Sequence, residues 1–513
     1  MDLRIFFVLC AFWYIVEPAR ILGIFPTPAK SHFTLGFRLM KELADRGHEV
    51  TMVSPFPQEM PISNYSDIPV ESMSEALESF KKDFYSRESM CLVSSVKFIH
   101  NMAYELTEKL LSHNNFQNLL KSGRKFDLIV MEYFLNDAAI GVGTFFNAPV
   151  VLFSSLPSSA LTNHLFANPA PSSYVPHLLS PYTGKMSFWE RWSNSLYNTI
   201  DILYKHYHML PKHDYILKKF ISSELSIEDV MYNASLMLLN SHPSVSEPVP
   251  HTPSMIEIGS FHIDSPKNLS EEFRKFMDEA DEGVVLFSMV LTLITKKREA
   301  IAKAFGKIKQ KVLWKFEDDN FLELPTNLKL ANWVPQQDIL AHPNTKAFIS
   351  HGGMLSSIEA VYFGVPVIGI PIYGDQKMNI AKSVQNGYAV SVPFRELTEE
   401  KLTWALNEVL SSSKYMNNAK TRSKIMRDQL VSPLDAAIYW MEYVIRQNGA
   451  THLQSSGVKL KWYQRNMLDI ILVLVVVDVI LFLIFYYIFK HIIHHVAGKI
   501  RGRPNKKYER LSK

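Results

Sequence analysis

The stretch ANWVPQQDILAHPNTKAFISHGGMLSSIEAVYFGVPVIGIPIYGDQKMNI, residues 331–380, decides the fold of this chain. Within it, residues 346–350 (KAFIS) and 365–372 (VPVIGIPI) are short and apolar, and residues 354–363 have helical character. A strand that turns directly into a helix and is followed by another strand is the repeating unit of a parallel α/β sheet. The pattern therefore predicts two successive strand–turn–helix units.

The turn His351-Gly352-Gly353, between the first of these strands and its helix, predicts an anion site. Glycines let a ligand approach the backbone N–H groups, and the positive end of a helix dipole favours negative charge. Asp375 and Gln376 follow the second strand, at the edge where open α/β sheets bind their ligands. A nucleotide diphosphate is the ligand that this arrangement suggests.

The same alternation of strands and helices extends over both halves of the chain. The first half predicts strands over residues 21–25, 50–53, 126–131 and 148–153, and a helix over 33–46 that Gly47 ends. After a segment rich in Pro and Ser (242–253), the second half predicts strands over 283–289 and 311–316 around a helix over 297–308. Two parallel α/β domains joined by a linker are expected.

Seven residues in and near the opening stretch form a recognisable signature: Trp333, Gln336, His351, Gly353, Glu359, Asp375 and Gln376. In this signature the chain resembles the membrane-bound animal UDP-glycosyltransferases, which conjugate small lipophilic molecules, and the resemblance runs from residue 21 to the basic tail. It implies the GT-B fold, with two Rossmann-like domains facing each other across a cleft. It further implies an acceptor-binding domain over residues 20–242, a UDP-sugar-binding domain over 254–430, and a segment over 431–466 that returns to the first domain.

The resemblance also implies the residue that removes a proton from the acceptor. His32, after the first predicted strand, matches the catalytic base of the family, and histidine titrates in the right range for that role. A carboxylate behind the imidazole would stabilise its protonated form. Alignment on the strand that starts near residue 126 places Glu132 there, where vertebrate members have Asp, and Asp137 is the second choice.

For the donor, the resemblance implies a contact with each part of a UDP-sugar and no metal or other cofactor. Trp333 and Gln336 would hold the uracil, and His351 and Gly353 the diphosphate, beside the loop that starts at Ser288. Ser356 is a further residue expected to bind the UDP-sugar. Glu359 would accept hydrogen bonds from the ribose, and Asp375 and Gln376 would bind the sugar. Glu317-Asp318-Asp319 is an acidic run that we interpret as a solvated loop.

Two positions depart from the family pattern. Val290, followed by Leu291, replaces a glycine in the loop expected beside the phosphates, and valine reaches φ > 0 only at a cost. Leu355 stands where vertebrate enzymes carry an asparagine, and a hydrophobic residue is common there in invertebrate members. The second departure indicates an insect-type enzyme. The departure at Val290 leaves open an alternative, in which the chain is an inactive paralogue that binds lipophilic ligands or associates with active relatives.

Both ends of the chain predict a relation to a membrane. Residues 1–19 resemble a secretory signal peptide, and 467–489 are apolar enough to span a bilayer. The tail, residues 490–513, carries eight Lys and Arg and is expected in the cytoplasm. The body would then lie in the lumen of the endoplasmic reticulum, where three sequons would be glycosylated: Asn64, Asn233 and Asn268.

Composition agrees with a folded enzyme that does not bind nucleic acid. The 513 residues are 47% apolar and 20% charged, and the net charge is only +4. Residues 156–219 are rich in aromatic residues, which fits either an apolar acceptor pocket or ordinary packing. Taken together, an inverting transfer of a hexose from a UDP-sugar to a lipophilic hydroxyl is expected. Glucose is favoured over glucuronic acid, and the acceptor and the oligomeric state, alone or with relatives, stay open.

Overall fold

The computed structural model describes residues 18–75, 87–88, 90–289, 295–316 and 324–501. Three features of the sequence lie outside these ranges: nearly all of the expected signal peptide, the pair Val290-Leu291, and the acidic run 317–319. The chain divides into two compact units, Met1–Ser455 and Ser456–Lys513. The first unit holds both expected α/β domains, and each unit is described by itself.

The first lobe is built on a seven-stranded parallel sheet. Its strands, in spatial order, are β3 (Tyr65–Pro69), β2 (Glu49–Ser54), β1 (Arg20–Ile24), β4 (Leu128–Glu132), β5 (Val150–Ser154), β6 (Ala234–Leu239) and β7 (Met255–Glu257). Its helices are α2 (Lys30–Asp45), α4 (Leu92–Ser112), α5 (Asn114–Lys121), η2 (Asp137–Ile140), α6 (Gly141–Phe146), α7 (Ala160–Leu165), α8 (Phe188–Tyr204), the π-turn η3 (Lys205–Met209), α9 (Leu210–Phe220) and α10 (Ile227–Val230). The central strands β4, β5 and β6 are buried along their whole length, as strands covered by helices on both faces must be.

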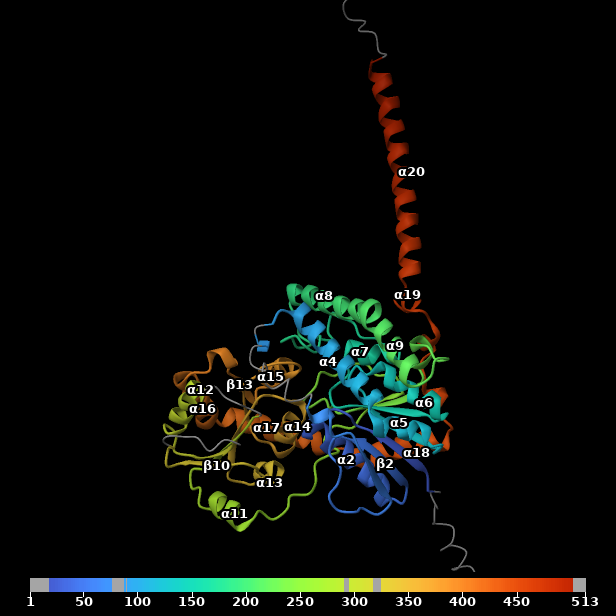
Figure 1. The fold of residues 1–513 in the computed structure, drawn as a ribbon. Helices are drawn as coiled ribbons and strands as arrows, with labels where there is room; N and C mark the ends of the chain where they lie inside the picture. Colours follow the sequence, from blue (N-terminus) through green and yellow to red (C-terminus); the bar gives the residue numbers. More distant parts are fainter. Residues whose placement is uncertain (1–17, 76–86, 89, 290–294, 317–323, 502–513) are drawn as a thin grey trace, which may run out of the picture. The chain divides into compact units, whose positions relative to one another are not determined.

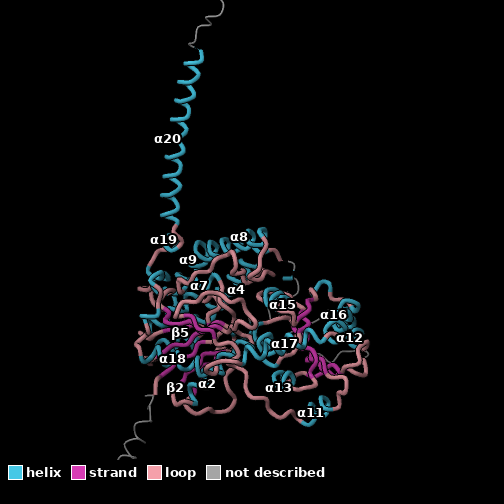
Figure 2. The backbone as a smooth tube through the Cα atoms, turned by 180° about the vertical axis from the view of Figure 1, so that it is seen from behind, coloured by secondary structure: helices cyan, strands magenta, loops and turns pink. Residues whose placement is uncertain are grey.

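The second lobe contains a six-stranded parallel sheet. Its order is β10 (Leu328–Ala331), β9 (Lys311–Lys315), β8 (Val284–Ser288), β11 (Thr345–Ser350), β12 (Val367–Gly369) and β13 (Ala389–Ser391). Its helices are α11 (Glu271–Asp278), α12 (Thr295–Phe305), α13 (Gln336–Ala341), α14 (Met354–Phe363), α15 (Gln376–Gln385), η4 (Phe394–Glu396), α16 (Glu399–Ser411) and α17 (Ser413–Arg427). Figure 2 shows the strands of the two sheets as separate magenta groups with helices around each. The expected pair of Rossmann-like lobes is confirmed.

In each sheet the strand order changes direction at the strand that comes first in the sequence. β1 lies between β2 and β4, and β8 lies between β9 and β11. In open α/β sheets the carboxyl ends of the strands at such a switch point form the ligand crevice. The residues that follow β1, β4, β8 and β11 are therefore the ones that the fold gathers into a site.

Three differences between the predicted and the observed elements have a clear physical reason. α2 begins at Lys30 rather than at residue 33. The prediction missed this first turn because Lys30, Ser31 and His32 are polar and do not add to the apolar spacing of the helix. β12 covers only Val367–Gly369 of the predicted 365–372, since Pro366 and Pro371 cannot donate ladder hydrogen bonds. β3 was missed, because YSDIP is polar and ends in proline.

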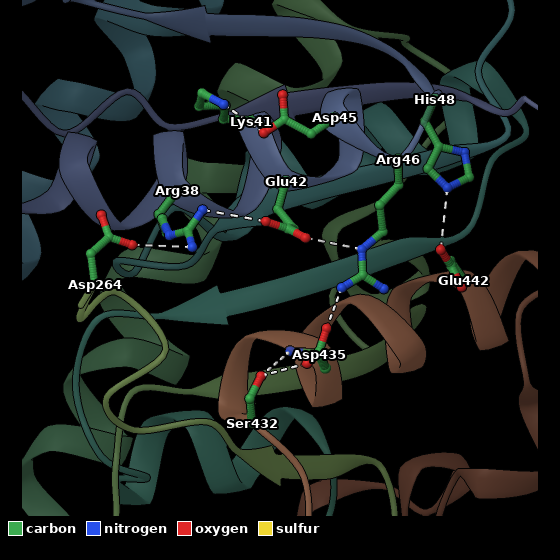
Figure 3. Close-up of polar contacts among 10 residues, drawn as sticks. All are labelled: Arg38, Lys41, Glu42, Asp45, Arg46, His48, Asp264, Ser432, Asp435 and Glu442. Carbon is green, nitrogen blue, oxygen red and sulfur yellow. Dashed lines mark hydrogen bonds and ion pairs between the residues drawn. The ribbon is translucent and has the colours of Figure 1, made fainter.

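Helix α18 (Pro433–Arg446) follows the second lobe in sequence but packs against the first (Figures 1 and 3). Its buried side chains Ile438, Met441 and Val444 join the core formed by α2, β1 and β5. Around this contact, Arg46, which directly follows α2, pairs with Asp435, and His48 Nε2 lies 3.5 Å from Glu442 Oε1. The short turn η5 (Thr451–Leu453) ends the unit. The helix that carries His32 is thus held by the last helix of the body.

The second unit contains η6 (Ser456–Lys459), α19 (Trp462–Arg465) and the long helix α20 (Leu468–Arg501). Residues 468–499 of α20 are long and apolar enough to cross a membrane. The predicted span over 467–489 lies almost wholly within this helix. The helix continues past residue 490, so the first part of the expected tail is helical, and the described chain ends at Arg501.

Candidate active site

His32 lies in the first turn of α2, directly after the carboxyl end of β1. The helix can approach the strand closely because Gly36 has no side chain: a Cβ there would lie 2.2 Å from the ring of Phe25. The imidazole is one-quarter exposed (23% for its side chain), so a substrate can reach it. The edge of its ring meets the Phe134 ring, with the centroids 5.9 Å apart.

Glu132, the last residue of β4, has a fully buried side chain, and its Oε1 lies 2.5 Å from His32 Nδ1. A carboxylate accepts hydrogen bonds, so this contact fixes the proton of the neutral imidazole on Nδ1 and leaves Nε2 as the acceptor. Glu132 Oε2 has no hydrogen-bond partner among the residues described. Within the described residues, the Glu132 carboxylate therefore bonds to His32 alone. This is expected of a carboxylate that orients a catalytic histidine.

Asp137, the second choice for that role, lies elsewhere. Its carboxylate accepts hydrogen bonds from Lys205 Nζ (2.9 Å) and from the hydroxyl of Tyr133 (3.0 Å), deep inside the first lobe. Burial raises the pKa of Asp137, but Lys205 and His213 outweigh that effect and leave the pKa below its usual value. Asp137 is thus an ionised partner of Lys205 within the core.

A second carboxylate, Asp375 of the other lobe, acts on His32 through its charge. Burial alone lowers the pKa of His32, but Glu132, with a smaller contribution from Asp375, outweighs it and raises the pKa above 6.5. Asp375 precedes α15, and its Oδ2 accepts a 2.6 Å hydrogen bond from Asn379 Nδ2. Burial raises the pKa of Asp375 to about 6, although the bond from Asn379 and the charge of His32 oppose it. The charges of two acids, one from each lobe, therefore act on the imidazole.

The turn after β11 has the geometry of an anion cradle. Gly352 has a φ of 84°, and Gly353 precedes the first residue of α14. A Cβ on Gly353 would lie 2.9 Å from His351 Nε2, so only glycine leaves this space open. Burial lowers the pKa of His351 to about 4, and its buried Nδ1 lacks a partner within the described part of the chain. The ring is neutral at pH 7 and offers a nitrogen to a ligand.

Glu359, in the second turn of α14, is buried, and its carboxylate accepts hydrogen bonds from two glutamine side chains. Gln336 Nε2 donates to Glu359 Oε2 (2.5 Å) and to Ser356 Oγ (3.2 Å), while Gln337 Nε2 donates to Glu359 Oε1 (2.9 Å). Trp333, just before α13, leaves 67% of its surface exposed. Gln336 and Glu359, expected at the uracil and the ribose, are thus in direct contact.

Sequence reasoning missed two residues at this place, Gln337 and His262. The His262 side chain is fully buried, and its Nε2 lies 3.6 Å from Glu359 Oε1. Neither ring nitrogen makes a hydrogen bond in the regions that the structure covers. His262 comes from the connection between the lobes, where no periodicity or motif marked it. A polar residue in the apolar run GSFHI was the only available signal.

The other residues expected to bind the UDP-sugar lie at the same edge of the second sheet. Gln376 Oε1 accepts hydrogen bonds from the backbone N–H groups of Ile372 (2.9 Å) and Tyr373 (3.1 Å), so a sugar would meet the nitrogen of that amide. Ser288 ends β8 and is 9% exposed. Leu355, at the second departure, packs against the core of the first lobe, so the side chain that replaces asparagine is used to join the lobes.

Three further observations concern the sequons, metal ligands and the aromatic segment. The sequons Asn64, Asn233 and Asn268 are all exposed. Within the described ranges, no group of three or more His, Cys, Asp or Glu could hold a metal ion. The idea that the aromatic residues of 156–219 surround a pocket is wrong for Phe188, Trp189 and Trp192 of α8, which are 56–71% exposed, because this helix buries its polar side instead.

Comparisons with known proteins show what the chain is similar to. The family model described as "UDP-glucoronosyl and UDP-glucosyl transferase" matches residues 24–502. UDP-glucosyltransferase 2 of Dactylopius coccus is 36% identical over 89% of this chain and 90% of its own length. UDP-glucuronosyltransferase 2C1 of Oryctolagus cuniculus is 32% identical over 85% of this chain and 91% of its own. Among solved structures, the calicheamicin glycosyltransferase CalG4 has a TM-score of 0.58 at 15% identity, covering 84% of this chain and 99% of that one.

Proposed function

The chain belongs to the UDP-glucuronosyl and UDP-glucosyl transferase family, and on this premise we propose that it transfers glucose from UDP-glucose to a hydroxyl group of a small lipophilic molecule, with inversion at the anomeric carbon. As a member of that family it is a glycosyltransferase that uses a UDP-sugar. Glucose is preferred to glucuronic acid because the insect UDP-glucosyltransferase is more similar to the chain (36% identity) than the rabbit UDP-glucuronosyltransferase (32%).

The observation that carries the proposal is the 2.5 Å contact between His32 Nδ1 and the buried carboxylate of Glu132. In the reaction, Nε2 of His32 takes the proton of the acceptor hydroxyl while that oxygen attacks the anomeric carbon. The bond from this carbon to the UDP oxygen breaks on the opposite side, so the configuration inverts and UDP leaves with the electron pair. Glu132 stabilises the imidazolium that forms, which lowers the barrier to proton transfer.

Donor binding is assigned to the second lobe. Trp333 would stack on the uracil, and Glu359 would exchange its bonds from Gln336 and Gln337 for bonds from the ribose hydroxyls. The amides of the Gly352-Gly353 turn, with the first turn of α14 and His351, would receive the diphosphate and stabilise the charge that grows on it as UDP departs. Asp375 and Gln376 would hold the sugar beside His32.

A membrane setting suits a lipophilic acceptor. In this proposal α20 anchors the enzyme in the membrane of the endoplasmic reticulum, with the body in the lumen. The basic residues that follow the apolar run support a cytoplasmic tail, and the exposure of all three sequons supports a glycosylated body. Apolar acceptors concentrate in the bilayer, so anchoring keeps the enzyme near its substrates.

The test is a screen of UDP-glucose, UDP-glucuronate and other UDP-sugars against hydrophobic phenols and alcohols, with UDP release and product formation both measured. Wild type should transfer glucose, and His32→Ala should lose roughly 10²–10⁴-fold in rate while it still binds UDP. Preference for UDP-glucuronate would correct only the sugar. Equal background rates for wild type and His32→Ala over the whole panel would reject catalysis and leave the paralogue that only binds ligands.

A further inference from the structure

A cluster of buried polar side chains, Tyr133, Asp137 and Lys205, lies inside the first lobe close to the end of β4. Lys205 Nζ donates to Asp137 Oδ1 (2.9 Å) and to the hydroxyl of Tyr133 (2.9 Å), and that hydroxyl donates to the same Asp137 oxygen (3.0 Å). The side chains of Lys205 and Asp137 are only 3% and 2% exposed. The attraction within a buried ion pair is largely offset by the loss of hydration, so stability alone does not explain the pair.

The end of β4 connects this cluster to the active site, because successive side chains of a strand point to opposite faces of the sheet. Val130 belongs to the core that includes α2, and Met131 belongs to the core that includes α9. Glu132 continues the first side, where it meets His32, and Tyr133 continues the second. Two neighbouring residues therefore reach the active site and the buried cluster.

The turn that follows β4 has a strained backbone. Leu135, which is buried, has a φ of 58°, in the left-handed region that residues other than glycine rarely adopt. Such a conformation persists only where the surrounding structure enforces it. Tyr133 and Asp137 lie two residues before and two residues after Leu135, and Lys205 donates a hydrogen bond to each of them. The ammonium group thus joins the two ends of the strained turn.

The residues inside this turn contact the pair formed by His32 and Glu132. The Phe134 ring meets the His32 ring edge to face, with the centroids 5.9 Å apart. Asn136 Nδ2 donates to the backbone carbonyl of Glu132 (2.9 Å), and Asn136 Oδ1 accepts a hydrogen bond from the backbone N–H of Phe134 (3.0 Å). A change in the turn would therefore move both the backbone of Glu132 and the ring that packs on the imidazole.

The positive charge of Lys205 maintains this arrangement. Burial raises the pKa of Asp137, and the charge of Lys205 is the largest effect that opposes it. His213 also interacts with Asp137, but burial lowers the pKa of His213 to about 4, so this ring is neutral at pH 7. Lys205 is the first residue of the π-turn η3, a rare element that is often found at functional sites. Without Lys205, the Asp137 carboxylate would lose its ammonium partner and would have to move or take up a proton.

We propose that Lys205 is a positioning residue for the transfer reaction: through Tyr133 and Asp137 it holds the turn after β4 in the conformation that keeps Glu132 against His32. The inference rests on the proposed function, in which His32 is the base. It gives Asp137 a part in the reaction that requires no contact with the imidazole.

The test measures the pKa of His32 directly, in the full-length protein in detergent. The C2 hydrogen of an imidazole exchanges for deuterium at a rate that rises with pH, with its midpoint at the pKa of the ring. In mass spectrometry after digestion with trypsin, residues 31–38 (SHFTLGFR) form one peptide, in which His32 is the only histidine. Binding of UDP checks that each variant is folded.

Three variants are compared with wild type. Lys205→Met removes the ammonium group. The double variant Asp137→Leu with Lys205→Met removes both charges of the pair, and it carries the test if the single variant does not fold. Asp201→Asn is the matched control, because Asp201 lies one helical turn before Lys205 and is equally part of a buried polar cluster, but bonds to His100 and His177.

In wild type the midpoint of exchange should lie above 6.5, because burial lowers the pKa of His32 but Glu132 outweighs it. In both Lys205 variants Glu132 should no longer be held in contact, so the midpoint should fall by about one unit. Their kcat should fall roughly 10–100-fold, while the KM for UDP-glucose stays unchanged because the donor residues lie in the second lobe. Asp201→Asn should keep the wild-type midpoint.

A wild-type midpoint in the folded double variant would overturn the proposal and limit Lys205 to the core. An equal shift in Asp201→Asn would also overturn it, since any loosening of the lobe would then have the same effect. The exchange needs no turnover, so Lys205 is tested even if wild type and His32→Ala show equal transfer rates, the result that rejects the proposed function.

Discussion

Glu132 Oε1 and His32 Nδ1 lie 2.5 Å apart, although the two residues come from different strand–helix units of the first sheet. The fold makes this contact possible because β1 and β4 are neighbours, so that His32 after one strand meets the last residue of the other. Glutamate reaches the ring here from the strand itself. The longer side chain that departs from the vertebrate pattern is therefore compatible with an orienting role.

Replacing Glu132 with glutamine should move the pH dependence of transfer to lower pH. The rate requires neutral His32, so wild type should gain activity as pH rises through a pKa above 6.5. Without the negative charge only burial acts strongly on the ring, and burial lowers the pKa. The maximal rate should fall by roughly 10²-fold or more, since the imidazolium loses its partner. A profile of kcat/KM between about pH 5 and 9 measures both effects.

Glu132→Asp is the matched control, because it keeps the charge but draws the carboxylate back by one methylene. The midpoint of its pH profile should lie nearer to that of wild type than the midpoint of Glu132→Gln does, and its maximal rate should be reduced. A midpoint that stays unchanged in Glu132→Gln would show that Glu132 does not set the protonation of His32.

His351 should make the binding of UDP dependent on pH. Its pKa is about 4 in the structure because the ring is buried, and a diphosphate beside it would raise that pKa. A group whose pKa rises on binding takes up a proton, so its contribution strengthens UDP binding as pH falls from about 7 towards 5. Calorimetry in buffers of different ionisation enthalpy should detect this uptake.

The matched comparison is His351→Ala, which should bind UDP roughly tenfold more weakly or worse and take up fewer protons. Asp375→Asn serves as a control, because the pKa of Asp375 is about 6 and its titration falls in the same range. Equal proton uptake by wild type and His351→Ala would place the diphosphate away from this ring.

The local parts of the site could be predicted from the sequence, and the reason is their short range. The turn at His351 and helix Met354–Phe363 follow from glycine geometry and apolar spacing within one unit. Glu132 follows from the family resemblance, which places an acid at the end of a strand whose residues are all buried. Such features depend on neighbours in sequence, which the pattern contains.

The parts that could not be predicted depend on contacts between distant segments. His262 meets Glu359 only because the linker folds back onto α14. The face of α8 that turns inward is decided by hydrogen bonds to residues outside that helix, namely Ser172, Val175, His100 and His177. Periodicity identifies two faces of a helix and leaves open which one the body covers.

His262 is expected to act on donor affinity as a positioning residue. The imidazole of His262 lies next to the Glu359 carboxylate, with Nε2 3.6 Å from Oε1. Loss of the ring should let the carboxylate turn, which would weaken the hydrogen bonds between Glu359 and the ribose. His262→Leu should raise the KM for the UDP-sugar by roughly 10-fold with little change in kcat. His262→Gln, which can return a nitrogen near the position of Nε2, should restore part of the affinity. An unchanged KM in a folded His262→Leu protein would limit this residue to packing.

The last helix of the body should stabilise the first lobe through its apolar side and much less through its ion pairs. Met441 is fully buried in the core shared with α2, and Met441→Ala should cost about 2–5 kcal/mol of unfolding free energy. Asp435, more than half exposed at 56%, pairs with Arg46 in solvent, so Asp435→Asn should cost less than about 1 kcal/mol. In thermal unfolding of the detergent-solubilised enzyme, Met441→Ala should lower Tm by roughly 5–10 °C and Asp435→Asn by about 2 °C or less. Similar losses in the two variants would mean that the polar network in Figure 3, and not the apolar contact, joins α18 to the helix that carries His32.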